Sequence, residues 1–235
     1  MKILIKTYNR KVRPFLKRNL LKFLINFGYS NSLNRIDLQI VNLFNAMKGG
    51  FFLEIGAADG VDCSNTYLLE KKYNWKGILI EPLLEQFILC KKIRKKSIVE
   101  NYILTNEKEK DNVFRISDEG LESRVIVEND ENSYSEYFEK ISYKEKKQPR
   151  VVENKTLTQI LNDHSIKNID IMSLDVEGYE YKLLEGYDHN TKIINYLIVE
   201  ADIEVFKEFA QLRGWQYIET WDGEANNNHL FKLFK

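Results

Sequence analysis

The sequence predicts an α/β fold with a mainly parallel sheet, because three apolar runs are followed by loops or acids typical of that class. Residues 51–55 open into a glycine loop at residues 56–60. The next apolar run, residues 78–80, ends on Glu81, and a third, residues 169–174, also ends on an acid. Parallel α/β folds that bind a nucleotide or nucleoside have this order of elements and hold the ligand at the carboxyl edge of the sheet.

The glycine spacing indicates which ligand the loop holds. A dinucleotide site has Gly-x-Gly-x-x-Gly, since a pyrophosphate must approach the backbone at a helix N-terminus. Here Gly56 and Gly60 flank Ala58. This spacing fits the first motif of S-adenosylmethionine-dependent methyltransferases, whose ligand has no phosphate and whose amino-acid tail needs polar groups. Four residues supply such groups: Asp59, Ser64, Asn65 and Thr66. The alternative is a buried strand followed by an ordinary tight turn.

The remaining contacts to an adenosine are predicted at the ends of the next strands. Glu81 is placed to accept hydrogen bonds from two ribose hydroxyls. Asn101 and Tyr102 are candidates to hold the adenine by an edge hydrogen bond and a ring face, or else they form a strand end with a solvated amide. The predicted cofactor-binding residues are Glu54, Gly56, Ala58, Asp59, Gly60, Asn65, Thr66, Glu81, Asn101 and Tyr102.

Two motifs resemble the FkbM-type methyltransferases. The first covers residues 60–82, with Ser-Asn-Thr-Tyr at 64–67 and Trp-Lys-Gly-Ile-Leu-Ile-Glu-Pro at 75–82. The second is the apolar run that ends Asp175-Val176-Glu177-Gly178. The resemblance extends from about residue 48 to the C-terminus. It implies a three-layer class I methyltransferase fold, S-adenosylmethionine as donor, and transfer to an oxygen, often a sugar hydroxyl of a glycan or glycosylated metabolite.

Composition limits the other possibilities. With 235 residues and 43% hydrophobic residues, the chain suits one α/β domain with an added segment. The two cysteines, Cys63 and Cys90, do not form a disulfide framework, so we expect a cytoplasmic location. The formal net charge is zero, but residues 1–36 carry lysines and arginines and no acid. The rest of the chain is therefore acidic, which argues against nucleic acid as a partner of the catalytic domain.

Residues 1–47 are predicted to form a basic N-terminal helical arm, with the methyltransferase domain at residues 48–235. Within the arm, residues 14–27 have apolar side chains at helical spacing, and charges interrupt every apolar run. The arm is therefore not a transmembrane span. Two interpretations remain: a helix that packs on the sheet or on a partner in a homodimer, and a peripheral element attracted to an anionic membrane surface.

The elements that follow are predicted in chain order. We expect a helix capped by Ser64 that runs to about residue 72, and a strand at residues 77–81. A helix at residues 83–93 and a third strand at residues 97–104 follow. Short strands are expected at residues 113–116 and 124–127, and a strand at residues 196–200.

Residues 128–150 are a long polar segment that ends after Pro149. A segment of this kind inside a compact domain is usually a lid over a site or a disordered excursion. Its aromatic residues suit stacking on sugar faces, but their spacing also fits a short surface helix.

Asp175 and Glu177 are the predicted catalytic carboxylates. Residues two apart in a strand point to one face, so we expect both at the carboxyl edge of a central strand. Two neighbouring carboxylates raise the proton affinity of one of them, which suits a general base. Gly178 then allows a turn into a helix at residues 179–184. The alternative is that Asp175 caps that helix and Glu177 is a solvated acid of its first turn.

The C-terminal hairpin is predicted to complete the acceptor site. If residues 215–220 form a parallel strand and residues 230–234 its antiparallel neighbour, the connection lies at the ligand edge. His229 is then a candidate general base, although a single histidine at a strand start is more often structural. The predicted acceptor-binding residues are Glu200, Trp221, Asp222 and Asn228.

The predicted activity is direct displacement, in which an acceptor oxygen loses its proton and attacks the donor's methyl group. We expect an O-methyltransferase that acts on a sugar or glycan hydroxyl, and we predict no metal site. One alternative is a binding module for S-adenosylmethionine without catalysis. The other is an NAD-dependent oxidoreductase, against which the absence of a middle glycine from the loop argues.

Overall fold

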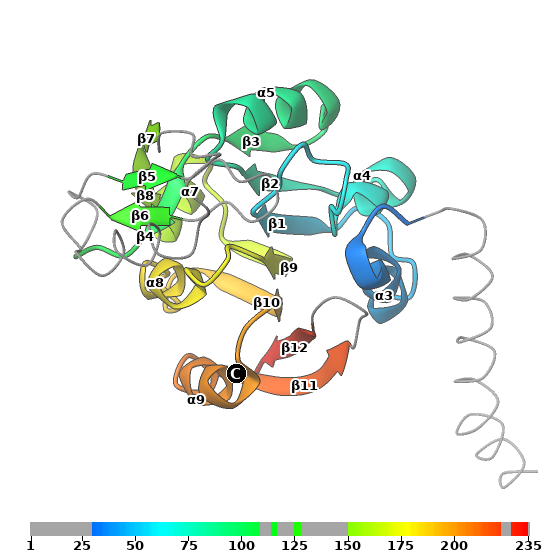
Figure 1. Ribbon diagram of the computed structural model, residues 1–235. Coiled ribbons are helices and arrows are strands. Elements are labelled where there is room, and N and C mark those ends of the chain that lie inside the picture. The colour runs from blue at the N-terminus through cyan, green and yellow to red at the C-terminus, as the bar shows by residue number, and fades with distance from the viewer. Residues whose placement is uncertain (1–29, 109–113, 117–124, 128–149, 222–226, 235) are drawn as a thin grey trace, which may run out of the picture.

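The protein is built around one central sheet that is mainly parallel (Figure 1). The computed structural model describes residues 30–108, 114–116, 125–127, 150–221 and 227–234. The strand order in the sheet is β11-β12-β10-β9-β1-β2-β3. Its strands are β1 (Phe51–Ile55), β2 (Lys76–Ile80), β3 (Ile98–Glu100), β9 (Asn168–Leu174), β10 (Ile193–Val199), β11 (Trp215–Trp221) and β12 (Asn228–Leu233).

The direction of one strand differs from all others in this sheet. β12 runs antiparallel to both of its neighbours, β10 and β11, whereas β3, β2, β1, β9 and β10 pair in parallel. The reversed last strand of the prediction is therefore confirmed. The four parallel strands β2, β1, β9 and β10 end at the same edge, where open α/β sheets bind ligands.

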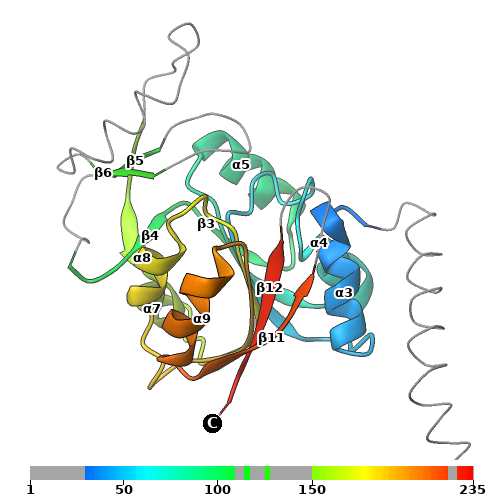
Figure 2. The ribbon, with the colours of Figure 1, turned by 60° about the horizontal axis from the view of Figure 1, so that its bottom comes forward.

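Helices cover both faces of the sheet and complete three layers (Figure 2). Helices α3, α4 and α5 pack on one face through a cluster that includes Ile40, Leu69 and Cys90. Helices α7, α8 and α9 pack on the other face, with Leu161 and Phe206 in their cluster. The helices are α3 (Ile36–Leu43), α4 (Tyr67–Tyr73), α5 (Leu84–Ile93), α7 (Leu157–Asp163), α8 (Glu180–Glu185) and α9 (Ile203–Gln211).

The predicted third strand is in fact two strands that belong to different sheets. β3 ends at Glu100, and β4 (Ile103–Thr105) pairs instead with β8 (Asn154–Thr156). The break falls at Asn101, whose side-chain amide donates hydrogen bonds to the carbonyls of Glu81 and Pro82. A second small sheet has the order β6-β5-β7, formed by β5 (Phe114–Ile116), β6 (Val125–Val127) and β7 (Arg150–Val152).

The segment before β1 packs on the domain through a buried carboxylate. Asp37, in the first turn of α3, is buried and accepts hydrogen bonds from Ser30 Oγ at 2.6 Å and from the backbone N–H of Asn31 at 3.3 Å. A short 3-10 helix, η2 (Leu33–Arg35), lies between these residues and α3. Because α3 contributes to the same core cluster as β1, the fold includes residues N-terminal to position 48.

The amphipathic helix predicted at residues 14–27 and nearly all of the polar segment at 128–150 lie outside the described residues. Within the described part of the chain, no helix is long and apolar enough to cross a membrane.

Candidate active site

A cavity of about 600 Å³ opens at the carboxyl edge of the central sheet. Each of the four parallel strands at its base delivers the next residue of the chain to the cavity wall. These residues are Gly56 after β1, Glu81 after β2, Asp175 after β9 and Glu200 after β10. The topology thus brings together, at the carboxyl edge of the sheet, side chains that are far apart in the sequence.

The loop after β1 is shaped by close backbone packing. Gly56 has a φ of 84°, and a Cβ at this position would lie 2.0 Å from the carbonyl oxygen of Asp175, so only glycine fits. Ala58 also has a left-handed φ, of 46°, and its N–H donates to Glu81 Oε2 at 2.8 Å. The other oxygen of Glu81 accepts from the N–H of Leu83 at 2.8 Å. Glu81 therefore joins the glycine loop to the turn after β2.

A buried ionic network holds this loop from behind. Glu54 accepts hydrogen bonds from the hydroxyls of Ser64 and Thr66 and from the N–H of Asn65. Arg94, at the C-terminal end of α5, lies 3.5 Å from Glu54 and 3.0 Å from Glu70. Its guanidinium also donates to Ser64, to Thr66 and to the carbonyl of Gly60. Glu54 lines the cavity, but its carboxylate is bound by the protein itself.

The role of Arg94 in holding the loop was not predicted from the sequence. It is 1% exposed, yet in the sequence it is one basic residue among several at the end of a helix. Its partners lie 24 to 40 residues away in the chain, so no local pattern indicates the contact. An arginine that falls on the buried side of an otherwise lysine-rich helix end is the one signal that would have pointed to it.

Asn65 connects the N-terminal segment to the centre of the sheet. Its Nδ2 donates to Ser173 Oγ of β9 at 2.8 Å, and its Oδ1 accepts from the hydroxyl of Ser32. Leu33, which follows Ser32, lines the cavity together with Cys63. The predicted polar loop residue is therefore in the cavity wall, where it also positions a segment that sequence reasoning did not assign to the site.

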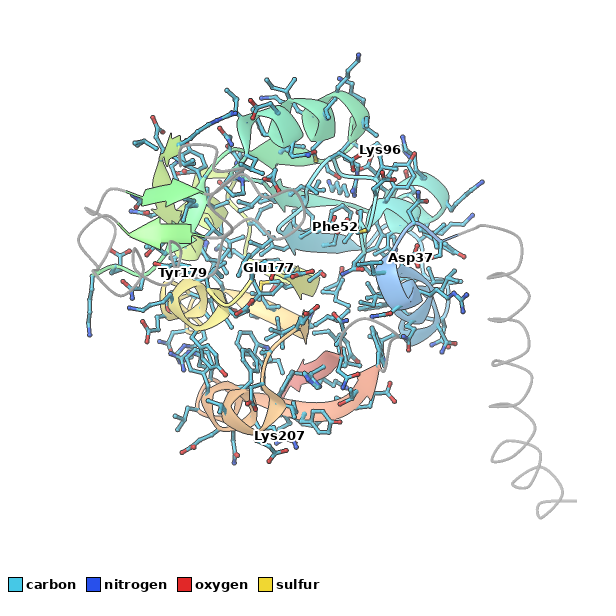
Figure 3. The ribbon with its side chains drawn as sticks, viewed as in Figure 1. Asp37, Phe52, Lys96, Glu177, Tyr179 and Lys207 are labelled. Carbon is cyan, nitrogen blue, oxygen red and sulfur yellow. The ribbon has the colours of Figure 1, made fainter. Side chains whose placement is uncertain are left out.

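The strand β9 ends before the two predicted catalytic carboxylates. Leu174 is its last residue, and Glu177 has a left-handed φ of 56°, so Asp175 and Glu177 do not alternate along a strand as predicted. A turn carries both instead, and the buried Glu180 accepts hydrogen bonds from the N–H groups of Val176 and Gly178. Both carboxylates still line the same cavity, and Figure 3 shows Glu177 at the end of β9.

Three carboxyl groups of the cavity have pKa values near neutrality. Desolvation within the cavity raises the pKa of Asp175 to about 6, and the negative charge of Glu177 contributes to the rise. The pKa of Glu200 is raised to about 7 by desolvation and by the charge of Asp175. Burial raises the pKa of Glu81 to about 7 as well, against its two backbone hydrogen bonds. Asp175 and Glu200 thus have the proton affinity of general bases at physiological pH.

Four predicted cofactor residues lie outside this cavity for identifiable reasons. Asp59 closes the loop by accepting hydrogen bonds from the N–H groups of residues 61 and 62. A Cβ at Gly60 would lie 2.6 Å from Cys90 Sγ, so this glycine serves packing against α5. Thr66 belongs to the buried network, and Asn101 holds the turn after β2 and lines a neighbouring cavity. Tyr102, in contrast, lines the main cavity.

The C-terminal hairpin does not bring its side chains into the cavity. His229 is 4% exposed, pairs with Val199 in the sheet and shares a hydrogen bond with Thr220 Oγ1 at 2.9 Å. Trp221 is buried in the core cluster of α3 and α4, and Asn228 pairs with it across the ladder. The prediction fails because β11 extends to Trp221 and pairs these residues within the sheet. Asp222 lies outside the described residues.

The described residues hold no group of three histidine, cysteine or acidic side chains arranged to bind a metal ion. The cavity wall is nevertheless strongly acidic. In the part of the wall that the structure describes, the ionisable side chains other than Cys63 and the tyrosines are all carboxylates: Glu54, Asp62, Glu81, Asp175, Glu177 and Glu200.

The strand order and the reversed β12 are those of the class I methyltransferase fold, and the cavity lies at the carboxyl edge of its sheet. The family model of the methyltransferase FkbM domain matches residues 54–230. The chain therefore belongs to the FkbM methyltransferase family, as its two motifs predicted. Among curated proteins, none matches this sequence.

Several solved structures are similar to this chain at low sequence identity. A human methyltransferase 10 domain containing protein has a TM-score of 0.51 at 11% identity, over 94% of this chain and 96% of that one. A TehB-like SAM-dependent methyltransferase from Corynebacterium glutamicum has a TM-score of 0.47 at 10% identity, over 94% and 100% of the two chains. Fibrillarin from Aeropyrum pernix, solved with S-adenosyl-L-methionine, has a TM-score of 0.42 at 8% identity, over 79% and 67%.

S-adenosylmethionine is the cofactor, and the charge of the cavity suits it. The sulfonium and the ammonium of this molecule are cations, which an acidic wall favours. Glu81 offers a carboxylate for ribose hydroxyls beside the glycine loop. The described lining residues include no basic side chain, which agrees with a ligand that has no phosphate. When bound, the cofactor supplies a methyl group on a positively charged sulfur, ready for transfer to a nucleophile.

Proposed function

We propose that the protein is an O-methyltransferase whose acceptor is a sugar hydroxyl of a glycan or glycosylated metabolite. The observation that supports this most is the trio of Asp175, Glu177 and Glu200 in one cavity. Desolvation and mutual repulsion raise the pKa of Asp175 to about 6 and that of Glu200 to about 7. A carboxylate with such a pKa accepts the proton of a hydroxyl at neutral pH.

In this proposal each carboxylate has a distinct task. Asp175, next to the backbone of Gly56, accepts the acceptor's proton as the new carbon–oxygen bond forms. Glu177 and Glu200 accept hydrogen bonds from neighbouring hydroxyls and so orient the sugar. Orientation offsets roughly 7 to 11 kcal/mol of a bimolecular barrier, whereas a general base contributes about 10²- to 10⁴-fold. Positioning of the acceptor therefore matters more than the base.

The charge of the cavity also supports a neutral acceptor over a nucleic acid or another phosphorylated molecule. Among the described residues, six carboxylates and no basic side chain line the wall, and phosphate groups need Lys, Arg or backbone N–H donors. A sugar hydroxyl, in contrast, donates its hydrogen bond to a carboxylate.

The proposal extends to location and partners. We propose a cytoplasmic enzyme whose basic arm contacts an anionic membrane surface or a second copy of the chain through residues 1–27. Residues 1–36 carry lysines and arginines and no acid, which supports attraction to an anionic membrane surface. Glycan acceptors can be assembled at such a surface. A truncated chain that starts near residue 34 should sediment less with anionic vesicles than the full chain does, and unchanged sedimentation would assign the arm to the fold or to a dimer.

The acceptor class is tested by transfer of a labelled methyl group from S-adenosylmethionine to glycan extracts and to defined sugars. We expect label that survives mild alkali and is recovered, after acid hydrolysis, as an O-methyl sugar. The Asp175→Asn variant, assayed in parallel, should give at least about tenfold less product, since a general base contributes more than that to the rate.

Alkali-labile label would indicate a carboxyl acceptor, and label on an amine or a nucleic acid would likewise contradict the proposal. If S-adenosylhomocysteine binds but no acceptor from any extract is labelled, the chain is a binding module without catalysis.

A further inference from the structure

Helix α5 presents an apolar and basic stripe to solvent on the outside of the domain. Leu84 is 51% exposed and Ile88 is 55% exposed, and both lie on the stripe continued by Lys91 and Lys92. These four residues have the i, i+4, i+7 and i+8 spacing of one helix face. Leu89, at the border of the stripe, is 46% exposed. Large apolar side chains therefore occupy half of the stripe and lysines the other half.

Further lysines extend the basic half of this stripe onto α4. The C-terminal ends of α4 and α5 are adjacent, because Lys96 Nζ donates to Asn74 Oδ1 at 3.2 Å. The exposed lysines of this region, together with those of the stripe, are Lys71, Lys72, Lys76, Lys91, Lys92, Lys95 and Lys96.

Acids do not neutralise this surface. Within residues 67–97 the acidic side chains are Glu70, Glu81 and Glu85. Glu70 is buried and paired with Arg94, and Glu81 is buried in the cavity. Glu85 is exposed but forms an ion pair with Arg150 of β7. The surface thus combines exposed apolar side chains with a strong positive charge.

We propose that this face of α5 docks on an anionic membrane surface. Lysine ammonium groups are attracted to anionic headgroups, and their stems lie along apolar surface, so lysines and leucines can share one interfacial helix face. Binding to a polyanion such as a nucleic acid would use the lysines but would leave the exposed Leu84 and Ile88 without a role.

This docking places the cavity beside the membrane. The residue before α5, Leu83, and Gln86 in its first turn both line the cavity, so a membrane along α5 lies next to the cavity wall. Helix α9 is on the opposite side of the molecule: Lys96 and Lys207 mark the two sides in Figure 3. Membrane binding does not depend on the acceptor or on methyl transfer, so the two proposals can fail separately.

The test uses the full chain and vesicles of phosphatidylcholine mixed with phosphatidylserine, in sedimentation titrations at low salt. The paired change Lys91→Glu with Lys92→Glu should weaken binding by about 25-fold, since each basic residue near the surface contributes about fivefold. Ile88→Ser should weaken it by about fivefold through lost apolar burial. Because the N-terminal arm is present in every variant, a difference between variants reports on α5.

Matched controls lie on the opposite face. Val205 of α9 is 59% exposed, so Val205→Ser removes an equally accessible apolar side chain. Lys167→Glu with Lys182→Glu makes the same change of charge at exposed lysines elsewhere. We expect both controls to bind as the parent does, and all variants to keep the parent's circular dichroism spectrum.

Unchanged vesicle binding in the α5 variants would overturn the proposal. An equal loss in the charge control would also overturn it, since net charge alone would then govern binding. If the lysine pair matters and Ile88→Ser does not, the surface binds polyanions through charge, and the membrane assignment is wrong.

Discussion

The two halves of the cavity are built on opposite physical principles. On the side of β1 and β2, the buried Arg94 pairs with Glu54 and Glu70, so opposite charges fix the loop. On the side of β9 and β10, Asp175 and Glu200 are partly desolvated and lie among like charges, and both effects raise their pKa values. The first arrangement holds the glycine loop in one conformation, and the second raises the proton affinity of the carboxylates.

The two halves of the cavity thus separate binding of the cofactor from transfer of the acceptor's proton. A cofactor site must keep one geometry in every turnover, which buried, hydrogen-bonded ion pairs provide. A base must exchange a proton near pH 7, which requires carboxylates that are partly desolvated and near other acids. We therefore expect substitutions on the first side to change stability and donor binding, and substitutions on the second to change turnover.

The largest effect on folding is expected for Arg94→Met. This change leaves the carboxylates of Glu54 and Glu70 buried without their cation, and breaking a buried pair in this way costs about 3 to 5 kcal/mol. Urea unfolding of the purified protein measures the loss. Lys95→Met is the matched control, because this exposed neighbour should change the free energy of unfolding by less than about 0.5 kcal/mol. Equal stability of the two variants would show that the network does not hold the loop.

Substitutions on the side of β9 and β10 should change the turnover rate. We expect Asp175→Asn to lower kcat by about 10²- to 10⁴-fold, because an amide cannot take the acceptor's proton. Glu177→Gln should have a smaller effect, as the proposal gives it only a hydrogen bond to the acceptor. Calorimetry with S-adenosylhomocysteine should show donor affinity within a few fold of the parent. Unchanged kcat in both variants would show that the two residues serve only to form the turn between β9 and α8.

The sequence predicted the sheet and the strand-end acids because both depend on local pattern. The apolar runs before Glu81, Asp175 and Glu200 form strands, and the parallel order brings their ends together. Contacts that depend on loop geometry were not predictable in this way. Glu177 shares the cavity through a left-handed turn, although the prediction assumed strand alternation.

Long-range packing accounts for the other differences. His229 and Trp221 were predicted at the rim, but sequence does not fix where a hairpin begins, and both are paired inside the sheet. Arg94 was missed because its partners become neighbours only when α5 packs behind the loop after β1. Asn101 was predicted to bind adenine, and its amide instead binds backbone carbonyls of the turn that carries Glu81.

Substitution of Glu81 should have an effect of intermediate size. Glu81 lies on the cofactor side of the cavity, but its pKa is raised as on the other side. We expect Glu81→Gln to weaken binding of S-adenosylhomocysteine by about 1.5 to 3 kcal/mol for each charge-assisted hydrogen bond lost. The parent's affinity should rise with pH through about 7, where Glu81 ionises and becomes the better acceptor, and the variant should lose this rise. Glu85→Gln, on the outer side of α5, is the control and should bind as the parent does.

The smallest effect concerns stability and has an unusual sign. The folded-state pKa of Asp175 is raised from 3.8 to about 6, so the folded state binds the proton more strongly than the unfolded state. The free energy of unfolding of the parent should therefore fall as pH rises between about 4 and 6, and stay lower above that range. Asp175→Asn is neutral at every pH and escapes this loss.

We accordingly expect Asp175→Asn to equal the parent near pH 4 and to be more stable at pH 8. The shift alone would correspond to roughly 3 kcal/mol, but solvent screens this accessible group, so a gain of about 1 kcal/mol is expected. Thermal unfolding at several pH values between these limits measures it. Asp188→Asn is the control of opposite sign, because hydrogen bonds from Thr191 and Asn190 lower the pKa of Asp188 and its ionised form stabilises the fold. If the difference in stability between Asp175→Asn and the parent does not widen with pH, the cavity does not raise the pKa of Asp175. Repulsion between like charges would then not distinguish the two halves of the cavity.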